Sequence, residues 1–99
     1  MPIPTRDPLP DTVLPMRPEL WAEVTAILKL SPKQVQLVEL LLLGMQDKEI
    51  VKALGIKMPT LRTHLDRICR RVGARGRTQL VVRVLSAAIG ALEQRHPNR

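Results

Sequence analysis

The side chains best suited to chemistry in this 99-residue chain are arginines gathered in one segment. Residues 57–83 hold eight basic side chains, seven of them arginine, against one acidic side chain, Asp66, while the rest of the chain carries no net charge. A planar guanidinium forms paired hydrogen bonds with phosphate or guanine better than an ammonium does. The concentration of charge therefore predicts a polyanionic partner, because a merely solvated basic face would not need to be confined to one segment.

Other kinds of site find little support in the residue types. The chain has a single cysteine, Cys69, and two histidines, so we expect no disulfide, no metal site and no cofactor. Trp21 is the only aromatic residue, which argues against a stacking platform for single-stranded nucleic acid. Without paired carboxylates at helical spacing or a glycine-rich nucleotide loop, the chain is not expected to be an enzyme.

The elements that position the arginines are predicted to be helices alone. Apolar residues recur at helical spacing in five segments, and no segment alternates like a strand, so the fold class is all-α. Proline-rich residues 1–18 are expected to form a disordered tail, and residues 94–99 a frayed end. The expected helices cover residues 19–29, 32–44, 47–54, 58–72 and 78–92.

Local signals set the ends of these helices. Ser31 followed by Pro32 favours a helix start, and Asp47 and Thr78 are expected to cap the third and fifth helices. A glycine at position 73 is the expected stop of the fourth.

The fourth and fifth predicted helices differ in what lies opposite their buried stripes. In the fourth, apolar residues form one stripe, and a polar set lies on the other side: Arg62, Thr63, Asp66, Arg67 and Arg70. In the fifth, apolar residues span about 220° of the wheel, whereas one core-facing stripe needs only a little over 100°. The surplus predicts a second copy of the helix as its cover, with Val82, Leu85 and Ile89 at the contact.

The short helix 47–54, the glycine at 55 and the helix 58–72 form the pattern of a helix-turn-helix. In that motif the second helix enters the major groove of DNA, and the first braces it across the backbone.

Ordered sequence motifs sharpen this interpretation. These motifs are LSPKQ at 30–34, Gly44, DKEI at 47–50, LGI at 54–56, TLRTHL at 60–65, Ile68, VG at 72–73 and RT at 77–78. With these residues, the chain resembles the LuxR/GerE-type DNA-binding domain of bacterial transcription regulators from residue 30 to about 85. The resemblance implies a compact four-helix domain over residues 30–93, to which the helix at 19–29 is added, packing Trp21 against the domain.

The resemblance also implies roles for individual residues. Arg62, Thr63 and Asp66 occupy the positions that meet base edges. Phosphate contacts are implied for Lys48, Thr60 and His64. Arg67 and Arg70 flank this surface and are expected to be further phosphate or base contacts, and Lys57 is expected to contact phosphate as an added cation. For His64, a role that merely braces the helix pair is equally open, and Arg77 is expected to brace the fold.

Three residues depart from the family pattern. Gln34 replaces a glutamate, so any ion pair made there is expected to be lost. Lys57 replaces a capping serine and adds a cation beside the DNA. Asp66 can accept a hydrogen bond from the cytosine amino group or pair with Arg62 or Arg70 on the same helix face, and the pairing is slightly favoured.

The expected function is a sequence-specific regulator of transcription that binds double-stranded DNA. A homodimer on an inverted repeat, with half-sites about 10 bp apart, is expected. No sensor domain is expected, because the proline-rich residues 1–18 and one short helix cannot fold into one. With no signal peptide or membrane-spanning run in the sequence, the protein is expected to be cytoplasmic and nucleoid-associated. Two alternatives are an interaction protein for a larger regulator or RNA polymerase, and a non-specific packaging protein.

Overall fold

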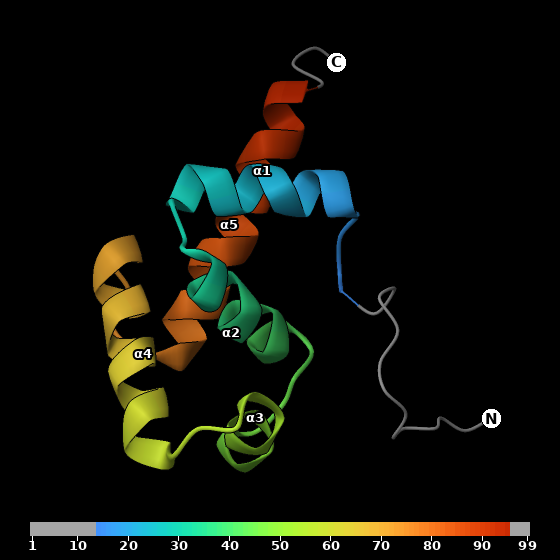
Figure 1. Ribbon diagram of the computed structural model, residues 1–99. Helices are drawn as coiled ribbons and strands as arrows, with labels where there is room; N and C mark the ends of the chain where they lie inside the picture. The colour runs from blue at the N-terminus through green and yellow to red at the C-terminus, as the bar shows by residue number, and fades with distance from the viewer. Residues whose placement is uncertain (1–13, 96–99) are drawn as a thin grey trace, which may run out of the picture.

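The computed structural model describes residues 14–95, and this part of the chain contains five helices and no strand. In order they are α1 (Pro18–Leu28), α2 (Pro32–Leu42), α3 (Asp47–Leu54), α4 (Met58–Val72) and α5 (Arg77–Arg95). α1 crosses α5, α2 lies below α1, α4 runs along the left side of the molecule, and α3 lies at the bottom, away from the last turn of α5 (Figure 1). The all-α prediction is confirmed.

The core draws apolar side chains from all five helices. Its fully buried members include Val24 of α1, Leu37 of α2, Ile50 of α3, Leu61 of α4 and Leu80 of α5. Each of these helices buries one stripe and leaves its other side to solvent, as an amphipathic helix does.

The added helix α1 joins this core as expected. Trp21 is buried, and its indole N–H donates a hydrogen bond to the Glu39 carboxylate on α2 at 2.7 Å. A buried tryptophan needs such a partner for its one polar atom. The contact therefore ties α1 to α2 while the apolar ring fills the core.

The start of α2 was predicted correctly. The Ser31 hydroxyl accepts from the Gln34 backbone N–H at 3.2 Å, and the Gln34 side-chain oxygen accepts from the Ser31 N–H at 3.0 Å. This reciprocal pair is a capping box, in which glutamine serves as well as glutamate.

Two other capping predictions are wrong. α3 is preceded by Gln46, whose backbone N–H donates to the Glu49 carboxylate at 2.7 Å, so Asp47 is already helical and its side chain is used elsewhere. α5 begins one residue before Thr78, because the Gly76 carbonyl accepts the first helical N–H, from Leu80, at 2.8 Å.

The ends of the chain also differ from expectation. α1 begins at Pro18 and α5 continues through Arg95, so the expected frayed end starts too early. Of the expected tail, residues 1–13 lie outside the described residues, but Leu14 and Met16 pack partly buried against the core. No helix within residues 14–95 is long and apolar enough to span a membrane.

Candidate nucleic-acid interface

The turn between α3 and α4 holds the two helices of the motif together. Gly55 ends α3 with φ +67°, a left-handed conformation that favours glycine. The next N–H, from Ile56, donates back to the Val51 carbonyl at 3.0 Å, and the Ile56 side chain packs against the core. The expected helix-turn-helix is therefore present, with α4 as its second helix.

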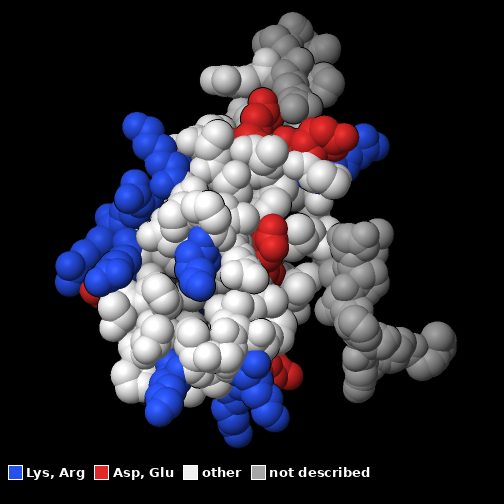
Figure 2. Space-filling view, in the orientation of Figure 1, with Lys and Arg blue, Asp and Glu red and all other residues white. Residues whose placement is uncertain are grey.

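α4 separates an apolar face from a polar one. Leu61 and Ile68 are completely buried, while the residues predicted to face DNA are exposed: Arg62, Thr63, Asp66, Arg67 and Arg70. Figure 2 shows Lys and Arg side chains gathered at the left edge of the molecule, over the C-terminal half of α4. The packing of α4 thus leaves its basic face open to a large ligand.

The N-terminal end of α4 carries the smaller polar residues. Lys57 precedes the helix and makes no side-chain cap, as expected for a cation in that position. Thr60 is exposed, and the Thr63 hydroxyl donates to the Pro59 carbonyl at 3.1 Å. This bond orients the Thr63 side chain and leaves its oxygen able to accept another hydrogen bond.

Asp66 forms the ion pair that the sequence favoured, and its partner is Arg70. The two side chains approach to 3.0 Å, with 78% of the Arg70 and 59% of the Asp66 side chain exposed. An exposed pair of this spacing on one helix contributes only about 0.3–0.5 kcal/mol. The pair can therefore open when a stronger partner approaches, so a base contact by Asp66 is compatible with it.

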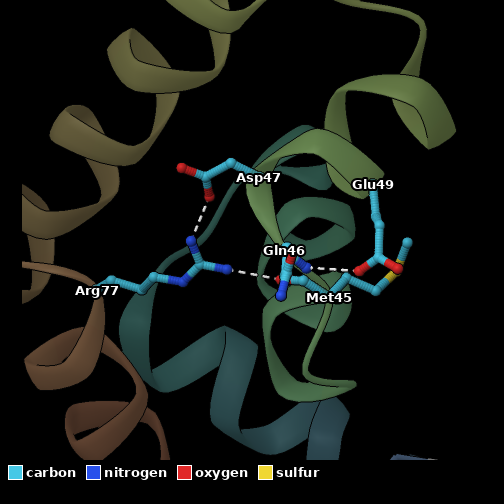
Figure 3. A network of polar contacts seen from close by, with 5 residues as sticks. All are labelled: Met45, Gln46, Asp47, Glu49 and Arg77. Carbon is cyan, nitrogen blue, oxygen red and sulfur yellow. Dashed lines mark hydrogen bonds and ion pairs between the residues drawn. The ribbon is translucent and has the colours of Figure 1, made fainter.

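Arg77 braces the fold, as the resemblance implied. Its guanidinium donates to the Asp47 carboxylate and, at 2.6 Å, to the Met45 carbonyl (Figure 3). These two bonds hold the start of α5 against the start of α3, and they explain why the Asp47 side chain does not cap its own helix.

The other cations of residues 57–83 fall into two groups. Arg83 donates to the Gly73 carbonyl at the end of α4, at 3.1 Å, and so also braces the fold. The side chains of five cations form no hydrogen bond or ion pair within residues 14–95: Lys57, Arg62, Arg67, Arg71 and Arg75. Arg71 was not among the predicted site residues.

The two remaining predicted phosphate contacts lie on the same pair of helices. Lys48 is exposed on the first turn of α3. His64 is half-buried on α4 and makes no hydrogen bond in the part of the chain described. Its contact with phosphate thus stays a prediction, as does the bracing alternative.

α5 leaves an apolar stripe exposed on the side away from the core. Its four large residues have exposed fractions of 53% (Val82), 38% (Leu85), 56% (Ile89) and 43% (Leu92). Their spacing of three, four and three residues places them on one line along the helix. The three residues predicted at a dimer contact are all in this stripe.

Cys69 has no features of a reactive thiol. It is partly buried on α4, where desolvation and, to a smaller degree, the Asp66 carboxylate raise its pKa above the ordinary value. Thiolate is therefore disfavoured there. Within residues 14–95, no group of three or more His, Cys, Asp or Glu side chains is placed to hold a metal ion.

A helix-turn-helix with an open, arginine-rich second helix defines a class of DNA-binding protein. Residues 28–84 match the family GerE, "Bacterial regulatory proteins, luxR family", and the chain belongs to this family. The resemblance seen in the sequence is thereby confirmed, and the chain is a DNA-binding regulator of transcription. No curated protein and no solved structure matches the chain.

Proposed function

We propose that the chain reads a specific sequence in double-stranded DNA with α4 in the major groove, as a homodimer on an inverted repeat. The observation that carries the proposal is the division of α4 into a buried apolar stripe and an exposed face that combines arginines with Thr63 and Asp66. Lysine-rich non-specific binding needs only positive charge, whereas this face also holds groups that can discriminate bases.

The base-reading residues are Arg62, Thr63 and Asp66. An arginine can donate two hydrogen bonds to guanine, and a carboxylate can accept from the cytosine amino group. The Thr63 side chain, oriented by the bond from its hydroxyl to the Pro59 carbonyl, supplies a hydroxyl acceptor and a methyl group.

The surrounding residues contact phosphates and set the register of the protein on DNA. They lie on the exposed surfaces of α3 and α4: Lys48, Lys57, Thr60, His64, Arg67 and Arg70. Such contacts contribute affinity that depends on salt but little on sequence.

The homodimer forms through the apolar stripe of α5. A second copy is the natural cover for Val82, Leu85 and Ile89, because two identical stripes related by a two-fold axis cover each other. Two copies of α4 would then face two half-sites about one turn of DNA apart, about 10 bp.

The test is selection of duplexes from a random-sequence pool by the purified chain at about 0.15 M salt, the physiological range. A short inverted repeat is the expected product. Unselected DNA that dissociates steeply with added salt would overturn sequence reading and leave a packaging protein.

A second candidate function rests on the same exposed stripe of α5. Apolar residues that are more than a third exposed also suit a larger regulator or RNA polymerase, with DNA contact secondary. This candidate predicts that no duplex is enriched. It also predicts that a charge at Ile89 abolishes the regulatory function of the chain, while Arg62→Ala has little effect on that function.

A further inference from the structure

A shallow hollow of about 480 Å³ lies between the first turn of α2 and the C-terminal half of α4. It is lined by Gln34, Arg67, Arg70 and Arg71. Figure 2 shows the cations of this region at the left edge of the molecule. Three arginines thus line one small space, and the fourth lining residue is neutral.

The charge in this hollow has no internal balance. No carboxylate lines it, and the neighbouring Asp66 is paired with Arg70. The side chains of Arg67 and Arg71 form no hydrogen bond or ion pair within residues 14–95. Cations on neighbouring turns of one helix repel one another, and an anion that accepts from several guanidinium groups at once, as a phosphate does, relieves this repulsion.

Gln34 also takes part in the capping box of α2, and this role does not depend on whether the residue at position 34 is neutral or charged. Its side-chain oxygen accepts from the Ser31 N–H in the capping box that starts α2. Glutamate satisfies a capping box equally well. The cap therefore does not require a neutral residue at position 34, whereas a carboxylate there would sit among the arginines and neutralise part of their charge.

We infer that the hollow is a phosphate-binding site, occupied by a backbone phosphate of the bound DNA beyond the bases that α4 reads. The inference rests on the proposed function. Arg71 follows Thr63 by eight residues, about 12 Å along the helix axis, and the major groove is about 12 Å wide. When Thr63 faces the bases, Arg67 and Arg71 reach toward the wall of the groove, where the phosphates lie.

The test compares Gln34→Glu with Gln36→Glu in the full chain. Gln36 is exposed on the same helix and lies about 200° around it, so the control adds the same charge away from the hollow. The readout is the dependence of affinity on salt, measured with the duplex enriched from the random pool. Urea unfolding of both variants checks that the fold is kept.

We expect Gln34→Glu to weaken binding about fivefold at 0.15 M salt and to reduce the slope of log K against log salt by about one, the loss of one phosphate contact. Gln36→Glu should change the slope little. Arg71→Ala should act like Gln34→Glu, and the double variant should lose little more than either single one, because both remove the same contact.

The other possible outcomes distinguish a failure of the phosphate site from a failure of the proposed function. If Gln34→Glu and Gln36→Glu bound normally and with equal salt slopes, the hollow would not be a phosphate-binding site, and sequence reading by α4 would stand. A wild-type chain that binds no duplex would overturn the proposed function and this inference with it. Binding of inorganic phosphate, seen by NMR at the arginine Nε signals and lost in Gln34→Glu, would assign the hollow to a free phosphorylated ligand if the DNA slopes were equal.

Discussion

α4 and α5 are packed against each other and are built alike on their inner sides, but their outer sides are opposite in character. Both bury one apolar stripe, which includes Ile68 on α4 and Leu80 on α5. Outside, α4 presents arginines and α5 presents an apolar line from Val82 to Leu92. The inner stripes stabilise the fold, whereas the outer faces differ in the partner that each would suit, a polyanion for α4 and, as we propose, an apolar surface for α5.

The largest expected effect tests the similarity of the two inner stripes. We expect Ile68→Ala and Leu80→Ala each to lower the free energy of unfolding by about 2–5 kcal/mol, because each leaves a cavity at a fully buried site. Arg67→Ala, on the outer face of α4, should change it by less than about 0.5 kcal/mol. Urea unfolding measures the free energy of unfolding of all three variants. A loss below about 1 kcal/mol in either core variant would contradict the conclusion that a buried stripe stabilises both helices.

The next effect tests the outer face of α5. Ile89→Asp places a charge in the apolar stripe, and we expect it to weaken dimerisation about 100-fold, equivalent to about 2.7 kcal/mol. Ile27→Asp is the matched control, because Ile27 is equally exposed, at 54% against 56%, but lies on α1. Sedimentation measures the assembly, and a wild-type chain that is monomeric both free and on DNA would remove the proposed dimer.

The outer face of α4 is tested by Arg62→Ala. We expect it to cost about 1–3 kcal/mol on the preferred duplex and to relax the preference at one base pair, because a bidentate contact is lost. Arg67→Ala should weaken all duplexes about equally. The two selection profiles distinguish base reading from phosphate contact, and full-strength, fully selective binding by Arg62→Ala would show that α4 does not read bases through this residue.

A smaller effect separates arginines that look alike in the sequence. Arg77→Met removes the bonds to Asp47 and to the Met45 carbonyl, and we expect it to lower the free energy of unfolding by about 1 kcal/mol, since the pair is partly exposed. Arg75→Met, at a side chain with no partner in the described residues, should leave stability unchanged. If the two variants unfold alike, Arg77 is not a brace.

The bounds of α3 and α4 could be predicted from the sequence, because the glycines and the apolar periodicity that set them are local signals. The cap of α3 could not, because the Asp47 side chain is held by Arg77, thirty residues away. Arg71 was not among the predicted site residues for the same reason. Its hollow exists only where α2 approaches α4, and no spacing within one helix reveals that approach.

The smallest effect lies at the border between the two faces of α4, at Cys69. Its raised pKa means that the unfolded chain releases the thiol proton at lower pH than the folded chain does. The stability from this group is therefore fully present below the ordinary thiol pKa and is lost as pH rises through the raised one.

Iodoacetamide should label the folded chain more slowly than the urea-unfolded chain near pH 8, where the thiolate fraction differs. Asp66→Asn should lower the pKa of Cys69 part of the way back, because desolvation is the larger cause and the carboxylate the smaller one. Equal labelling rates in the folded and unfolded chains would place Cys69 with the exposed face of α4 and not with its packed one.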